Sequence, residues 1–276
     1  MKLNIVPPRQ GLLWVRLGMK TFWRQPLAMA GLFFMYMASV TVLSLVPLLG
    51  VALSLVLLPA ATLGLMAATR EADQGRFPMP VMLISAFRQG RDRSRAMVWL
   101  GVMYAGALLS VMGLSALFDD GQFARVYLGS GVPSEETVNA EGFMTALWVG
   151  MAFYIPVVML FWHAPALVHW HQVSPVKSLF FSLTACWRNK GAMLVYAATW
   201  MACFLFFGMG LALIGALLGS PRLISAMMLP AVLLMASMFF TSFYFTFRDC
   251  FAADAGDGEA VGRVVERDGL YDIEKD

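Results

Sequence analysis

Six long apolar stretches set the strongest limit on how this chain of 276 residues can fold. None of them contains Asp, Glu, Lys or Arg. A helix needs about 20 apolar residues to cross the hydrocarbon core of a bilayer, and one charge at mid-bilayer costs about 2.5–3.5 kcal/mol. The sequence therefore predicts an all-α fold, a polytopic transmembrane helical bundle. Its six predicted spans are residues 27–47, 49–69, 96–117, 143–168, 192–218 and 223–247.

The composition agrees with a chain embedded in a membrane. Hydrophobic residues make up 59% of it and charged residues only 13%, whereas soluble domains carry about 25% charged residues. The formal net charge of +3 is small, and the basic residues lie beside the spans. We therefore expect membrane lipids as partners and exclude nucleic acid.

The distribution of basic residues favours one orientation. They cluster before the first span and in the connections after spans 2, 4 and 6, whereas only Arg125 and Arg222 lie in the other connections. Cytoplasmic connections carry an excess of Lys and Arg. The pattern predicts that both chain ends face the cytoplasm (N-in/C-in). It also predicts a transmembrane domain over residues 1–248 and an acidic, disordered cytoplasmic tail over residues 249–276.

A short segment of helix length precedes each odd-numbered span. The segments cover residues 12–24, 80–95 and 175–190, and each ends in basic residues. In the first segment Arg16 and Lys20 are four residues apart and so share one helix face. We interpret the segments as short interfacial amphipathic helices whose basic residues contact lipid headgroups. The alternative is that they are basic flanks whose helical spacing is incidental. The candidate headgroup contacts are Arg16, Lys20, Arg24, Arg88, Arg91, Arg188 and Lys190.

Prolines mark the even-numbered spans. Pro59, Pro156 and Pro230 lie within spans 2, 4 and 6, and Pro165 is a second proline in span 4. Proline removes an internal hydrogen bond and kinks a helix. The predicted kinks either shape the bundle or open a cavity within it.

Three histidines are the only candidates for metal binding or catalysis: His163, His169 and His171. On a continuous helix His163 and His171 share a face but lie about 12 Å apart along the axis, and His169 points elsewhere. One metal ion cannot join them unless Pro165 breaks the helix. The alternative is that they lie beside Trp162 in an interfacial aromatic belt. We expect no metal and no cofactor.

The motifs of common catalytic sites are missing. The sequence has no glycine-rich phosphate loop, no H-E-x-x-H and no G-x-S-x-G, and its spans hold no aspartate. The buried ionisable groups that secondary transporters use are missing as well. We expect a non-catalytic module, not an enzyme, that interacts with lipids, with other membrane proteins or with itself. The alternative is a permease or channel for a neutral or lipidic solute through the proline-kinked bundle.

Short motifs resemble an uncharacterised family of six-span bacterial inner-membrane proteins. They are FWRQP at residues 22–26, LLPAA at 57–61, AFRQGR at 86–91, APAL at 164–167, SPVK at 174–177 and CWRN at 186–189. That family is distantly similar to the membrane domain attached to some glycerophosphodiester phosphodiesterases. The resemblance covers about residues 1–250. It implies a multi-pass protein of the bacterial cytoplasmic membrane, and it brings no activity or catalytic residue.

Overall fold

The structure, a computed structural model, describes residues 2–47, 49–127, 142–217, 219 and 221–252. It confirms the all-α fold, with six helical segments long and apolar enough to cross a membrane. The predicted tail from residue 253 and residues 128–141, in the connection between the third and fourth spans, lie outside the described residues. The spanning helices are α2 (Pro26–Ser44), α3 (Gly50–Asp73), α4 (Arg91–Ser115), α7 (Phe143–Phe161) continued by α8 (Ala164–Trp170), α10 (Lys190–Leu217) and α11 (Pro221–Cys250).

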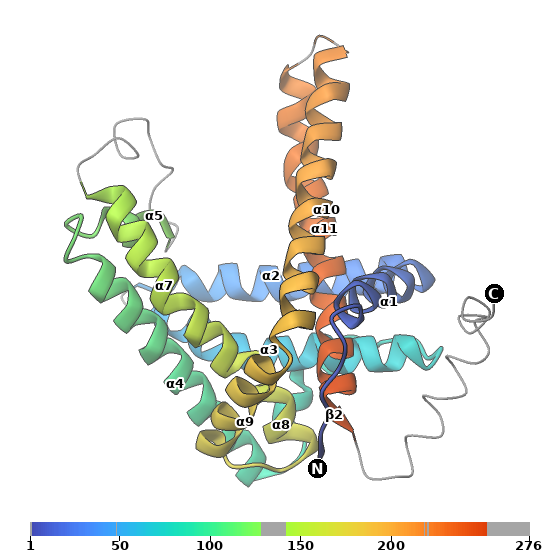
Figure 1. Cartoon of the computed structure of the whole chain (residues 1–276), viewed down its shortest axis with the longest axis vertical. Coiled ribbons are helices and arrows are strands. Elements are labelled where there is room, and N and C mark those ends of the chain that lie inside the picture. The colour runs from blue at the N-terminus through green and yellow to red at the C-terminus, as the bar shows by residue number, and fades with distance from the viewer. Residues whose placement is uncertain (1, 48, 128–141, 218, 220, 253–276) are drawn as a thin grey trace.

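These helices form three hairpins that diverge from one end of the molecule (Figure 1). The hairpins are α2–α3, α4–α7 and α10–α11. We call the shared end the base. It holds α1 (Gln10–Arg24), the 3₁₀ helix η1 (Pro80–Phe87), α8, α9 (Pro175–Arg188) and the described ends of the chain. The opposite ends of the spanning helices point away from the base, and α5 (Gln122–Tyr127) follows α4 at its far end.

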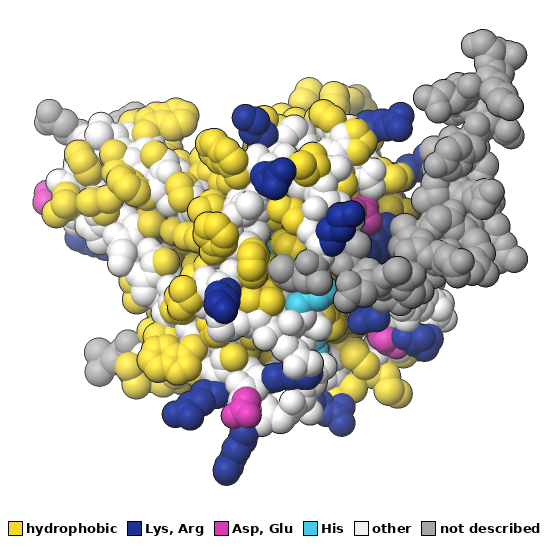
Figure 2. Space-filling view, turned by 60° about the horizontal axis from the view of Figure 1, so that its bottom comes forward, with side chains coloured by type: hydrophobic (Ala, Val, Ile, Leu, Met, Phe, Trp, Pro, Cys, Tyr) yellow, Lys and Arg dark blue, Asp and Glu magenta, His cyan; other side chains and the backbone are white. Residues whose placement is uncertain are grey.

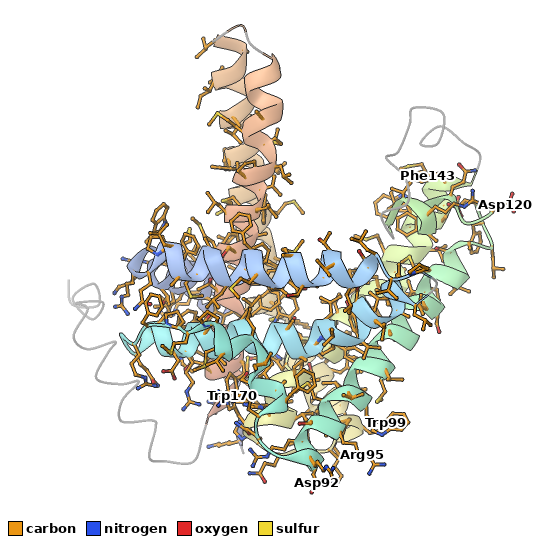
Figure 3. All side chains as sticks on the ribbon, turned by 180° about the vertical axis from the view of Figure 1, so that it is seen from behind. Asp92, Arg95, Trp99, Asp120, Phe143 and Trp170 are labelled. Atoms are coloured by element: carbon orange, nitrogen blue, oxygen red, sulfur yellow. The ribbon has the colours of Figure 1, made fainter. Side chains whose placement is uncertain are left out.

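The two ends of α4 show how charge follows this arrangement. Asp92 and Arg95 lie at the base, whereas Asp120, just after α4, lies at the far end beside Phe143 at the start of α7 (Figure 3). All the predicted basic connections within the described residues belong to the base. That the base faces the cytoplasm stays a prediction of the positive-inside rule.

Two predicted short segments form helices at their expected places, α1 and α9. The segment predicted over residues 80–95 is a correction: the 3₁₀ helix η1 ends at Phe87, and residues 91–95 begin α4, because the chain turns at Gly90, where φ is 99°.

The face that contacts protein differs between α1 and α9: in α9 it consists of small residues, Ser178, Ser182, Ala185 and Cys186. In α1 the buried face includes Gly11, Trp14, Gly18 and Phe22 and packs against α10 and α11. A Cβ on Gly18 would lie 2.5 Å from the Cβ of Ser242, so α1 and α11 approach closely because this position has no side chain.

Span 4 is a correction to the sequence prediction of one helix over residues 143–168. The helix α7 ends at Phe161, and α8 starts at Ala164. The hydroxyl of Ser182 in α9 accepts a hydrogen bond from the backbone N–H of His163 (2.9 Å) and donates one to the carbonyl of Met159 (2.8 Å). In a continuous helix these two backbone groups would bond to each other. The inserted hydroxyl and Pro165, which has no N–H, together explain the break.

The two described ends of the chain are joined at the base. Strand β1 (Lys2–Leu3) pairs antiparallel with β2 (Phe251–Ala252). The side chain of Asn189, between α9 and α10, accepts a hydrogen bond from the N–H of Val6 (2.8 Å) and donates one to the carbonyl of Asn4 (3.0 Å). Asp249 accepts hydrogen bonds from Gln10 (2.7 Å) and Trp14 (2.8 Å). Both described ends of the chain therefore lie on the same side of the bundle.

Candidate headgroup-binding site

The seven basic residues that the sequence singles out are all exposed, and all belong to the base. Figure 2 shows this end of the molecule, where Lys and Arg side chains are interspersed among hydrophobic ones. Their surroundings differ. The guanidinium of Arg24 donates a hydrogen bond to the carbonyl of Asp73 (3.3 Å) and lies 4.0 Å from its carboxylate, which ties the end of α1 to the end of α3.

Each of the three short helices ends in an exposed aromatic residue followed by an arginine. The aromatic residues are Trp23 (65% exposed), Phe87 (37%) and Trp187 (64%). The arginines that follow them are Arg24, Arg88 and Arg188. The Nζ atom of Lys190 also lies 5.6 Å from the centre of the Trp187 ring. We call these three pairs the aromatic–arginine anchors. Such pairs suit the interface, where the ring lies at headgroup level and the cation meets phosphates.

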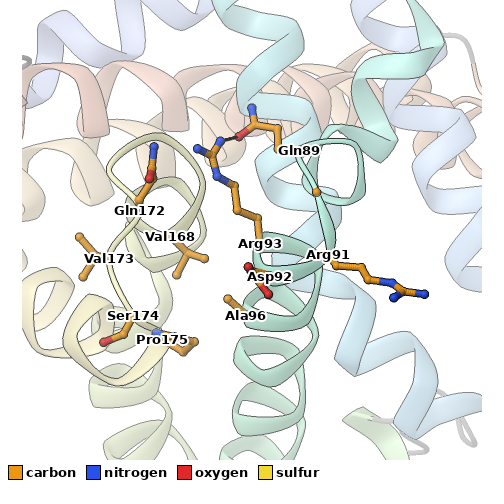
Figure 4. Close-up of a pocket in the computed structure, with 11 residues that line it drawn as sticks. Gln89, Arg91, Asp92, Arg93, Ala96, Val168, Gln172, Val173, Ser174 and Pro175 are labelled. Carbon is orange, nitrogen blue, oxygen red and sulfur yellow. Dashed lines mark hydrogen bonds between the residues drawn. The ribbon is translucent and has the colours of Figure 1, made fainter.

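A pocket of about 490 Å³ opens between the start of α4 and the start of α9 (Figure 4). We call it the α4–α9 pocket. Its volume is in the range of pockets that hold small molecules. It is lined by Gln89, Gly90, Arg91, Asp92, Arg93, Ala96, Val168, Gln172, Val173, Ser174 and Pro175.

Two helices begin at this pocket. Gly90 precedes α4 and Ser174 precedes α9, and neither residue caps its helix with a side-chain hydrogen bond. The first N–H groups of a helix have no partner within the helix, and the helix dipole places partial positive charge there. The backbone is unusual on both walls, with φ of 99° at Gly90 and 55° at Gln172. A residue other than glycine rarely adopts such a φ, and strained residues cluster at functional sites.

Side-chain contacts hold the wall of the pocket that Gln89 and Arg93 form. Arg93 donates a hydrogen bond to the side-chain oxygen of Gln89. The amide nitrogen of Gln89 lies 2.8 Å from Nε2 of His169, which is 4% exposed. If the amide donates this bond, the ring proton is on Nδ1. Among the described residues Nδ1 of His169 has no hydrogen-bond partner.

The structure does not bring the three histidines together. His163 is buried against Phe251, with Nδ1 3.8 Å from the sulfur of Cys186. His169 contacts Gln89, and the ring of His171 lies 5.8 Å from that of Phe247. The predicted condition for a metal site, a helix broken near Pro165, is met. Even so, no group of three candidate ligands is found within the part of the chain that the structure describes.

Sequence reasoning found Arg91 but missed Asp92, Arg93, Gln172 and Ser174. A weak signal exists in hindsight, because Gly90 and Ser174-Pro175 are typical residues at helix starts. Nothing local to either segment says that the two starts face each other. That arrangement depends on how α8 and α9 fold back against α4.

The chain is 39% identical over 254 residues to the probable inner membrane protein BTH_II0599 of Burkholderia thailandensis. The alignment covers 91% of this chain and 94% of the relative. No family model matches the chain. No solved structure matches it either.

Proposed function

Since the chain belongs to the inner-membrane protein family of this Burkholderia relative, we propose that it is a non-catalytic module that holds anionic lipid headgroups at its base. The chain is a multi-pass inner-membrane protein whose six apolar helices contact membrane lipids. The headgroup role and the absence of catalysis are the proposed part.

The observation that carries the proposal is the threefold recurrence of the aromatic–arginine anchors. The three short helices differ in sequence and in type, yet each ends at the base with an exposed ring followed by an exposed arginine. A basic residue near an anionic membrane surface contributes about 1 kcal/mol to the attraction. Exposed aromatic rings fix the depth of a helix end at the interface. The anchors therefore suit a base that lies in a headgroup layer rich in anionic lipid.

The permease or channel alternative receives less support. Pro59 is buried, whereas Pro156 and Pro230 are exposed, an arrangement that does not favour a shared pathway lined by the three prolines. The proposal also includes the likeness to the membrane domain attached to some glycerophosphodiester phosphodiesterases, which rests on the short motifs alone.

Association with other membrane proteins, or between copies of the chain, is compatible with the same anchors.

The proposal is tested by the selectivity of the full-length protein for spin-labelled phosphatidylglycerol over phosphatidylcholine in bilayers of defined composition. The test variant is Arg88→Gln combined with Arg188→Gln. Arg24 is left in place because its removal would leave Asp73 without one of its partners. The matched control is Arg125→Gln combined with Arg222→Gln, which removes the same charge from the predicted opposite side.

We expect the base variant to lose most of the preference for the anionic lipid and the control to keep it. Losing two contributions of about 1 kcal/mol each corresponds to a decrease of roughly tenfold or more in affinity at low salt. Equal preference in the two variants, or a larger loss in the control, would contradict the headgroup role.

A further inference from the structure

The α4–α9 pocket lies where α4 changes from a charged to an apolar sequence. The helix begins with Arg91, Asp92 and Arg93, and its apolar run starts at Ala96. Figure 4 shows Gln89, Arg93 and Gln172 at one end of the pocket and Ala96 and Pro175 at the end toward which α4 continues. The pocket is therefore polar at the level of the headgroups and apolar toward the hydrocarbon core. An amphipathic ligand fits it in one orientation.

Several features of the pocket favour a phosphate group. The wall of the pocket at the start of α9, Ser174 and Pro175, carries no acidic side chain. Arg93 is partly buried, and its contact with Gln89 positions it on the wall. Arginine presents several N–H donors that match phosphate oxygens. Gln89 is itself held by the buried His169, whose Nδ1 has no hydrogen-bond partner among the described residues.

Asp92 adds the opposite charge. Figure 4 shows Asp92 and Arg93 on the side of α4 that faces residues 172–175, whereas Arg91 points away. Asp92 is exposed, and no hydrogen bond or ion pair reaches its carboxylate from the described part of the chain. A ligand with negative charge alone would be repelled at this position. A primary ammonium group there would be attracted and could donate hydrogen bonds to the carboxylate.

We propose that the α4–α9 pocket binds a phosphate ester that also carries a primary ammonium group, which is the chemistry of a phosphoethanolamine headgroup. Arg93 holds the phosphate, and Asp92 holds the ammonium. The pocket is separate from the aromatic–arginine anchors. The inference rests on the proposed function only in that the base lies in a headgroup layer.

The test measures lipid retention by native mass spectrometry of the full-length protein in mild detergent. Phosphatidylethanolamine, phosphatidylcholine and phosphatidylglycerol with identical acyl chains compete in equal amounts. We expect one bound molecule of phosphatidylethanolamine per protein, at about ten times the abundance of either competitor. One charge-assisted hydrogen bond corresponds to a factor of that order in affinity. Phosphatidylcholine has a phosphate but no N–H donor, and phosphatidylglycerol has no amine.

Two variants separate the roles within the pocket. Asp92→Asn should bring phosphatidylethanolamine down to the level of phosphatidylcholine and raise retention of phosphatidylglycerol. Arg93→Gln should lower retention of all three lipids at this site. The matched controls are Asp120→Asn, an acidic residue at the far end, and Arg95→Gln, an exposed arginine of α4 that does not line the pocket. Both controls should behave as the unchanged protein does.

A last comparison identifies the source of the ligand. If millimolar O-phosphorylethanolamine displaces the retained lipid and inorganic phosphate does not, the pocket recognises the same chemistry in a soluble ligand. If neither displaces it, the acyl chains contribute and the ligand is the lipid. Preference for phosphatidylglycerol or phosphatidylcholine in the unchanged protein, or an unchanged ranking in Asp92→Asn, overturns the inference. If the headgroup role of the aromatic–arginine anchors is wrong, that result appears in a different experiment, the phosphatidylglycerol selectivity of the variant that combines Arg88→Gln with Arg188→Gln.

Discussion

Ser182 gives the most direct test of how this fold is held together. Its hydroxyl is fully buried and bonds two backbone groups of another segment, the N–H of His163 and the carbonyl of Met159. Ser182→Ala removes both hydrogen bonds and leaves the two backbone groups without that partner. The sulfur of Cys186, 3.8 Å from the Met159 carbonyl, can replace only a weak part of the loss.

The size of the effect follows from these two bonds. A buried polar group left without a partner costs about 1–3 kcal/mol. Hydrogen bonds between helices in membrane proteins contribute less on average, about 0.6 kcal/mol each, because the unfolded chain in the membrane finds other partners. We therefore expect Ser182→Ala to lower the free energy of unfolding by about 1–3 kcal/mol in total. At about 2–4 °C per kcal/mol for a chain of this size, the midpoint should fall by roughly 2 to 12 °C.

The measurement is thermal unfolding of the full-length protein in detergent, followed by the fraction that remains monodisperse in size-exclusion chromatography. Thr184→Ala is the matched control, because Thr184 lies two residues away on α9 and its hydroxyl bonds the carbonyl of Phe180 in the same helix (2.8 Å). The control should change stability by less than about 0.5 kcal/mol. If both variants unfold at the same temperature, the inserted hydroxyl does not hold the break in span 4.

Two further predictions concern close packing and burial at the base. Gly18→Ala should destabilise the protein by about 1–3 kcal/mol in the same unfolding assay, because the new Cβ would lie within 3 Å of the Cα of Ser242. The matched control is Gly31→Ala, where nothing lies within 4 Å of the new Cβ. This control should be neutral or slightly stabilising. Burial raises the pKa of the Cys186 thiol to about 12. The reactive thiolate at pH 8 should therefore be about one part in ten thousand. Peptide mass spectrometry should find Cys186 unlabelled by a water-soluble maleimide until the protein is unfolded in SDS, and rapid labelling of the folded protein would contradict its burial. The raised pKa also means that the contribution of the protonated thiol to stability is present below about pH 9 and is lost as the pH rises toward 12.

Much of this fold could be predicted because the bilayer imposes a local rule on the sequence. Residues in contact with acyl chains must be apolar, so the six spans and the three short helices follow from stretches of sequence read one at a time. The break in span 4 does not. Pro165 is visible in the sequence, but the hydroxyl that completes the break comes from Ser182, which is 19 residues beyond His163 on another helix.

The candidate site also has one part that the sequence predicts and one part that it does not. The seven basic residues were predicted from their position beside the spans, and all are exposed at the base. The α4–α9 pocket needs the starts of two helices to face each other, which no local pattern encodes. Charge alone assigns Asp249 to the acidic tail, yet in the structure it lies in α11 and accepts hydrogen bonds from Gln10 and Trp14. The charge of a side chain therefore predicted that it is exposed for the seven basic residues. Contacts between residues distant in sequence, such as those of Asp249, could not be predicted.

The break in span 4 and the pocket have one physical origin. The segment Phe143–Trp170 has 28 residues; as a continuous helix it would be about 42 Å long, against a hydrocarbon core of about 30 Å. Length alone does not force a break, because α10 also has 28 residues and is continuous. The difference is that α7 ends after 19 residues, about 28 Å. Pro165 and Ser182 then let α8 turn and pack against α3, α4 and α9. That turn brings residues 168–175 beside the start of α4, so the same contacts that end α7 also build the α4–α9 pocket.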